Sequence, residues 1–96
     1  MSEMQIRIDY GTRIVWGEPV EESEHEARLE VYDGALRRLL TEAYPAAAVR
    51  VTAHRGRGDS VDLAVYVDHD EVTDRYRQAV ERVTERAFEE ACQAQL

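Results

Sequence analysis

The apolar residues of this chain recur with two different periods, and the order of these periods constrains the fold more than any other feature. In residues 4–10, 48–54 and 61–67 apolar and polar residues alternate, which predicts strands with one buried face. The Gly-rich segment 55–60, between the last two, predicts a hairpin loop. The expected inward-facing residues of these strands are Met4, Ile6, Ile8, Tyr10, Val49, Val51, Ala53, Val61, Leu63, Val65 and Val67.

Two longer segments repeat their apolar residues every three or four positions, as an amphipathic helix does. The first is expected from about Glu21 to Tyr44, where Pro45 stops it, and the second from about Glu71 to beyond Ala91. The expected buried stripes are Leu29, Tyr32, Leu36, Leu39, Leu40 and Ala43 in the first helix and Val72, Tyr76, Val80, Val83 and Ala87 in the second.

Together these segments predict a single α+β domain over residues 1–96. The expected order is β(β)αββα, a two-layer sandwich with two helices packed on one face of a small mixed sheet. The optional strand lies within residues 11–16, which either extend the first strand or return as a second one. Because Cys92 is the only cysteine, no internal disulfide is possible.

The composition is acidic, with 20 acidic residues against 12 basic ones and a formal net charge of −8. This balance argues against direct binding of nucleic acid, which needs a basic surface. No apolar run approaches the ~20 residues of a membrane span, and the N-terminus lacks the apolar stretch of a secretory signal. We therefore expect a cytoplasmic protein with no membrane partner, and adaptation to high salt is an alternative explanation of the acidity.

The charge is unevenly distributed along the chain. Residues 18–33 contain seven acids and one arginine, a net charge of −6, whereas residues 34–57 carry +4. Such segregation polarises the field around a protein and influences which partners approach it. Carboxylates in a first helical turn also favour the positive end of the helix dipole. We interpret four glutamates at the start of the first helix as an auxiliary partner-binding surface, the N-terminal acidic patch: Glu21, Glu22, Glu24 and Glu26.

The second helix carries a row of acids opposite its apolar stripe. At ~100° per residue, four acids fall within about 80° of one another on the solvent side of the helix, with arginines beside them. The row is either a solvated face with Arg–Glu pairs at helical spacing, or a set of carboxylates that imitates nucleic-acid phosphates. We call this row the acidic ridge, and it consists of Asp74, Glu81, Glu85 and Glu89.

Residue types used by enzymes occur without the partners that catalysis needs. His25 begins the segment HEARLE like a zinc-protease helix, but Leu29 stands where the second metal ligand is required. Ser23, Ser60 and Cys92 have neither a Gly-x-Ser-x-Gly context nor an evident partner base. We therefore expect no enzyme and no metal.

The Gly-rich segment 55–60 is not a phosphate-binding loop, because it lacks the Lys-Ser/Thr ending of a P-loop and leads into a strand. Arg55 and Arg57 within it are either part of a solvated turn or a contact for an anion or for a partner's acids. We expect no cofactor.

Four segments in order carry a resemblance to a known family: LRRLLTEAYP (36–45), AVRV (48–51), VDLAVYV (61–67) and DRYRQAVERVTERAFEEA (74–91). The chain resembles the DinI-like damage-inducible proteins over about sixty residues. That resemblance implies a βαββα fold and binding to the recombinase RecA, with acids of the final helix in place of DNA phosphates. By position, the acidic ridge takes that role. The chain differs in its longer N-terminal part, through residues 11–26.

These observations favour a small, acidic, non-enzymatic regulator that binds and modulates a nucleic-acid-binding protein. A RecA-type recombinase in the DNA damage (SOS) response is the most specific candidate. A phage-type inhibitor of a nucleic-acid-guided defence complex has the same chemistry. A third alternative is a homodimeric subunit that associates through an exposed strand edge and Trp16, with its acidity serving only solubility or salt adaptation.

Overall fold

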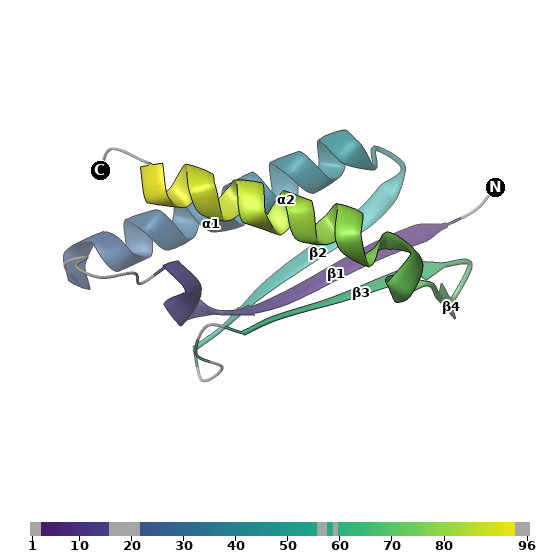
Figure 1. Ribbon diagram of the computed structural model, residues 1–96, viewed down its shortest axis with the longest axis horizontal. Helices are drawn as coiled ribbons and strands as arrows, with labels where there is room; N and C mark the ends of the chain where they lie inside the picture. The colour runs from purple at the N-terminus through teal and green to yellow at the C-terminus, as the bar shows by residue number, and fades with distance from the viewer. Residues whose placement is uncertain (1–2, 16–21, 56–57, 59, 94–96) are drawn as a thin grey trace.

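A computed structural model of the chain describes residues 3–15, 22–55, 58 and 60–93, and it has two layers (Figure 1). One layer is a mixed sheet of β1 (Met4–Gly11), β2 (Ala47–His54), β3 (Val61–Val67) and β4 (Asp70–Glu71). The other consists of α1 (Glu22–Ala43) and α2 (Thr73–Gln93), which cover the same face of the sheet. The predicted α+β class, with two helices on one face of a small mixed sheet, is therefore confirmed.

Strand β1 lies inside the sheet, whose strand order is β2-β1-β3-β4. It pairs in parallel with β2 and antiparallel with β3. Side chains alternate across a strand, so Ile6, Ile8 and Tyr10 share one face, and each is at most 1% exposed. These three residues form the floor of the core under the helices.

The sequence-based prediction of a hairpin between β2 and β3 is wrong, because β1 lies between these two strands. The chain leaves β1, forms α1 and returns as β2, a crossover that makes the two strands parallel. It then passes the end of β1 on its way to β3. There the backbone N–H groups of Gly11 and Arg13 donate to the carbonyls of Ser60 and Gly58, at 2.8 and 3.0 Å. Gly58 and Ser60 of the Gly-rich segment thus lie against the end of β1, and Gly58 supplies a φ of +65°.

The two helices run antiparallel above the sheet. Arg28, near the start of α1, donates to the backbone carbonyls of Ala91 and Cys92 in the last turn of α2, at 2.7 and 3.2 Å. At the other end, the rings of Tyr44 and Tyr76 meet edge to face with centroids 6.0 Å apart. Carbonyls in the last turn of a helix lack partners within the helix, so Arg28 both caps α2 and fixes it against α1.

Two alanines that the sequence places in the core are exposed instead. Ala43 is the last residue of α1 and lies at its open end. Ala53 lies on the edge strand β2, beside a hollow that also borders Gly34 of α1. Gly34 has no side chain, and a Cβ built there would meet nothing within 4 Å, so α1 does not cover Ala53.

Residues 12–15 answer the question that the sequence left open after the first strand. They form a short 3-10 helix, η1 (Thr12–Val15), and neither extend β1 nor make a second strand. Trp16 lies outside the described residues. Ile14 of η1 is partly buried and packs against the core.

Candidate protein-binding surface

The acidic ridge lies on the outer side of α2, as its helical spacing predicts. Its four carboxylates, on Asp74, Glu81, Glu85 and Glu89, belong to exposed residues. On the opposite side of the helix, Val80 and Ala87 are completely buried against the sheet and α1. The start of the helix is held by β3, because the backbone N–H of Val65 donates to Thr73 Oγ1 at 3.1 Å. The ridge therefore stands on a firmly packed element.

Most of the ridge is free of internal ion pairs. Asp74 lies 3.4 Å from Arg77 and is 99% exposed. Within the described part of the chain, Glu81, Glu85 and Glu89 form no ion pair. These three residues lie on successive turns, with a rise of about 6 Å from one to the next.

The arginines of α2 that the sequence places beside the ridge do not neutralise it by direct contact. Among the described residues, Arg75, Arg82 and Arg86 are exposed and form no ion pair. Glu90, the acid next to the ridge, behaves differently, because Arg38 of α1 holds both of its oxygens at 2.6 and 2.7 Å. The Arg–Glu pairing expected of an ordinary solvated face is thus limited on this helix to Arg77 and Asp74.

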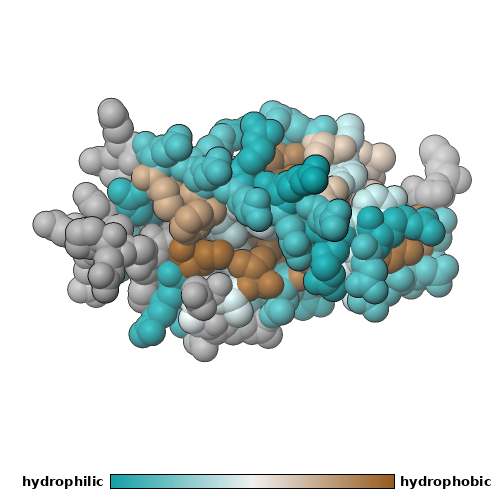
Figure 2. Space-filling view, viewed as in Figure 1, coloured by the Kyte–Doolittle hydropathy of each residue, from teal (hydrophilic) through white to brown (hydrophobic). Residues whose placement is uncertain are grey.

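An apolar hollow borders the C-terminal half of the ridge, and the sequence did not reveal it. Figure 2 shows hydrophobic side chains gathered along the border of α2 that faces η1. The hollow has a volume of about 470 Å³. Among the described residues, its wall comprises Ile14, Tyr32, Thr84, Glu85, Phe88 and Glu89. Two ridge carboxylates therefore stand at the rim of an apolar depression.

In the sequence, Phe88 is the residue that could have indicated this hollow. At ~100° per residue it falls about 40° from Asp74, on the side of the ridge and away from the buried stripe. It is nevertheless half-buried. Phe88 packs against the edge of the core and lines the hollow together with Ile14 of η1, which the unexpected 3-10 turn places there.

Tyr32, which lines this hollow, packs in the core against Tyr10, with ring centroids 4.9 Å apart and an edge-to-face geometry. The Tyr10 hydroxyl donates to Asp33 Oδ2 at 2.8 Å, and burial followed by this bond raises the pKa of Tyr10. Burial alone raises the pKa of Tyr32 to about 12. The Tyr32 hydroxyl is buried and has no hydrogen-bond partner among the described residues.

The N-terminal acidic patch is only partly within the described structure. Glu21 lies outside it, and for Glu22 and Glu24 only the backbone, within α1, is described. The remaining member, Glu26, is exposed and lies 4.0 Å from Arg55. Arg57, the other arginine considered in the Gly-rich segment, is also outside the described residues.

Glu26 belongs to a surface on the side of α1 that faces away from α2. It borders a second hollow with Glu30 and Asp33 of α1, above Tyr10 and Ala53 of the sheet. We call Glu26, Glu30 and Asp33 the α1 acidic cluster. The opposite side of α1 faces α2, as the contacts of Arg28 and Arg38 show. The structure therefore does not bring Glu26 and the acidic ridge together on one surface.

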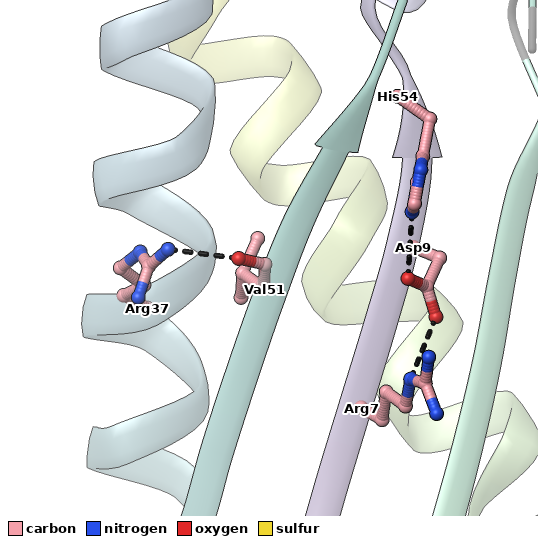
Figure 3. Close-up of polar contacts among 5 residues, drawn as sticks. All are labelled: Arg7, Asp9, Arg37, Val51 and His54. Carbon is pink, nitrogen blue, oxygen red and sulfur yellow. Dashed lines mark hydrogen bonds and ion pairs between the residues drawn. The ribbon is translucent and has the colours of Figure 1, made fainter. Parts of the chain in front are cut away.

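A third group of charges lies on the face of the sheet without helices and links β1 to β2 (Figure 3). His54 Nε2 is 2.8 Å from Asp9 Oδ1, and Arg7 Nε is 3.0 Å from Asp9 Oδ2. The hydrogen bond from His54, helped by the charge of Arg7, lowers the pKa of the Asp9 carboxyl. The contact between His54 and Asp9 adds a side-chain link to the backbone pairing of the two parallel strands.

Figure 3 also shows how α1 covers the edge of the sheet. Arg37 Nη2 donates to the backbone carbonyl of Val51 on the edge strand β2, at 2.8 Å. Its Nε donates to Asp33 Oδ1 at 2.6 Å, which holds the side chain in place. An arginine on an edge carbonyl obstructs pairing with another strand at that point.

No group of three or more potential metal ligands occurs among the described residues. In the same part of the chain, no helix is long and apolar enough to cross a membrane. No family model, curated protein sequence or solved structure matches this chain.

Proposed function

We propose that this protein is a small non-enzymatic regulator that places the acidic ridge on the basic, nucleic-acid-binding surface of another protein. The observation that carries the proposal is the row of three exposed glutamates, Glu81, Glu85 and Glu89, without ion-pair partners in the described structure. Unpaired carboxylates on successive turns of a rigid helix are available to a partner's cations. Their attraction to a basic groove needs no internal ion pair to be broken first.

The partner class follows from charge and from the resemblance in the sequence. An overall charge of −8 favours encounter with a basic surface and disfavours encounter with nucleic acid itself. The resemblance to DinI-like proteins makes a RecA-type recombinase in the DNA damage response the first partner to test. The same ridge chemistry suits inhibition of a nucleic-acid-guided defence complex, which is the second.

A homodimer built through the edge of the sheet is a weaker candidate. The edge strand β2 offers backbone groups for pairing, but Arg37 already occupies the Val51 carbonyl. On the other side β4 pairs only with Tyr66 and Val67 of β3. Each edge is thus obstructed at one point, while the rest of β2 and residues 61–64 of β3 have no strand on their outer side within the described structure, so the oligomeric state measured by sedimentation decides this alternative.

The test is a calorimetric titration of a purified RecA-type recombinase, and separately of a nucleic-acid-guided defence complex, with the wild type and two double variants. Glu81→Arg/Glu85→Arg reverses two ridge charges and should weaken binding about a hundredfold, because attraction becomes repulsion. The matched control, Glu30→Arg/Glu42→Arg, reverses two exposed glutamates of α1 and produces the same change in net charge. It should weaken binding no more than about threefold.

Equal losses in the two double variants would show that only net charge matters and that the ridge is not the contact. All four substitutions are at exposed positions, so each should change the free energy of unfolding by about 0.5 kcal/mol or less. Thermal unfolding of both variants checks that the fold is retained.

A further inference from the structure

The hollow beside the ridge combines three features. Its wall includes the apolar side chains of Ile14 of η1 and Phe88 of α2. Its rim carries the carboxylates of Glu85 and Glu89, which form no ion pair among the described residues. Its wall also includes Tyr32 of α1, which is 0% exposed.

Tyr32 also brings a buried hydroxyl without a partner to the wall of this hollow, one of three such buried polar atoms in the described structure beside Thr12 Oγ1 and Arg28 Nε. Buried polar groups in folded proteins almost always have a hydrogen-bond partner, and leaving one without a partner is costly. This hydroxyl has none among the described residues, whereas the neighbouring Tyr10 hydroxyl donates to Asp33. A phenol that stays protonated at neutral pH offers both a donor and an acceptor, and an N–H group entering the hollow would satisfy the acceptor.

We propose that this hollow binds an arginine side chain presented by a partner protein. The proposal rests on the proposed function, since it names the chemical group with which a basic partner engages the ridge. The aliphatic stem of the arginine lies against Ile14 and Phe88. Its guanidinium group meets the carboxylates of Glu85 and Glu89. Because Tyr32 is completely buried, the side chains above it must move apart before the guanidinium can donate to the Tyr32 hydroxyl.

Arginine fits these surroundings better than the other side chains of a basic surface. Its planar guanidinium carries five N–H donors, so it can serve two carboxylates and a hydroxyl at once, and it stacks on aromatic rings. Lysine has a compact, strongly hydrated ammonium group, which loses more hydration in an apolar depression. An uncharged apolar side chain would fill the hollow but leave the rim carboxylates without a counter-charge.

The first experiment uses short peptides as probes and NMR as the readout. The peptide acetyl-Gly-Arg-Gly-amide is titrated into the whole protein, beside versions with lysine, citrulline or norleucine in the central position. The arginine peptide should give saturable shifts at Ile14, Thr84 and Phe88, with at least about threefold tighter binding than the other three. Equal shifts with norleucine would overturn the proposal, as would shifts with arginine that spread along the ridge and spare Ile14.

The second experiment removes the hydroxyl alone. Tyr32→Phe keeps the ring in the core, and because the hydroxyl has no described partner, the thermal midpoint should stay equal or rise. Binding of the arginine peptide should weaken about two- to tenfold, the range for loss of one hydrogen bond. Ala79, an exposed residue of α2 outside the hollow, gives the control variant Ala79→Ser, which should bind the peptide like the wild type. Unchanged peptide binding by Tyr32→Phe would overturn the proposal.

The two proposals can fail separately in these assays. If Glu81→Arg/Glu85→Arg abolishes binding of the basic partner but Tyr32→Phe has no effect on that binding, the proposed function is supported and the arginine site is refuted. If the arginine peptide binds at Ile14 and Phe88 but Glu81→Arg/Glu85→Arg still binds the partner normally, the arginine site is supported and the proposed function is refuted. Sedimentation of the protein alone tests the remaining occupant: a dimer that blocks the peptide would assign the hollow to a second copy and overturn the proposal.

Discussion

The acidic ridge of α2 and the α1 acidic cluster have the same residue types but differ in what their carboxylates do. In the α1 cluster, Asp33 accepts hydrogen bonds from Tyr10 and Arg37, and Glu26 lies near Arg55. In the ridge, Glu81, Glu85 and Glu89 have no ion-pair partner in the described residues. In the described part of the acid-rich stretch, Asp33 is engaged within the fold, Glu26 is exposed and lies 4.0 Å from Arg55, and Glu30 forms no ion pair, whereas three of the four ridge carboxylates stay available.

This comparison shows that the availability of a charge, more than its density, marks a candidate binding surface. A carboxylate that accepts a buried hydroxyl contributes to stability, and its removal is felt by the fold. A carboxylate with no internal partner contributes little to stability and can serve binding. The following predictions separate these two roles.

The largest effect on stability is expected at Asp33. Asp33→Ala leaves the fully buried Tyr10 hydroxyl without its acceptor and frees Arg37 from its anchor, which should cost about 2 kcal/mol of unfolding free energy. Glu85→Ala on the ridge should change that free energy by about 0.5 kcal/mol or less. Urea denaturation of both variants measures the difference. Similar values for the two would remove the distinction between engaged and available carboxylates.

The next effect concerns pH and the bonds of Asp9 on the open face of the sheet. The folded protein lowers the pKa of Asp9 below its ordinary value of 3.8, so its contribution to stability is present above about pH 4 and is lost as pH falls through the folded-state pKa. Asp9→Asn should therefore cost about 1–2 kcal/mol at pH 6, where the bonds from His54 and Arg7 are intact. The cost should shrink as pH falls below about 4, because the carboxyl of the wild type is then progressively protonated. A cost independent of pH would contradict this account.

The smallest effect is expected from the N-terminal acidic patch. Replacing Glu21, Glu22, Glu24 and Glu26 by Gln removes four charges and keeps the size of the side chains. If the patch only steers a basic partner, the association rate should fall about two- to fivefold while the dissociation rate stays the same. Stopped-flow mixing with the partner measures both rates. An unchanged association rate would leave the patch with a role in helix capping or salt adaptation.

The sequence predicted the helices and the ridge because helical spacing alone determines which residues share a face. The same reasoning placed Val80 and Ala87 inside and Glu81 and Glu85 outside, and the structure agrees. It could not predict which strands are neighbours, because the alternation in β2 and β3 is the same whether they pair with each other or with β1. The parallel pairing of β1 and β2 depends on the path of α1.

The hollow beside the ridge could not be predicted from the sequence for a similar reason. Its wall brings together Ile14, Tyr32 and Phe88, which come from η1, α1 and α2. Only the packing of the three elements makes them neighbours, and η1 itself resembled a strand in the sequence. The bond between Tyr10 and Asp33 is equally non-local, since it joins residues 23 positions apart.

The most direct test of the central claim is the salt dependence of partner binding, measured for the wild type and for Glu81→Gln/Glu85→Gln/Glu89→Gln. Charge contacts at an exposed surface are screened over ~8–10 Å at ordinary ionic strength, so the affinity of the wild type should fall steeply as salt rises. If the ridge makes these contacts, the triple variant should bind more weakly at low salt and lose most of the slope. A slope unchanged by the three substitutions would contradict the claim that the acidic ridge is the surface that binds the partner.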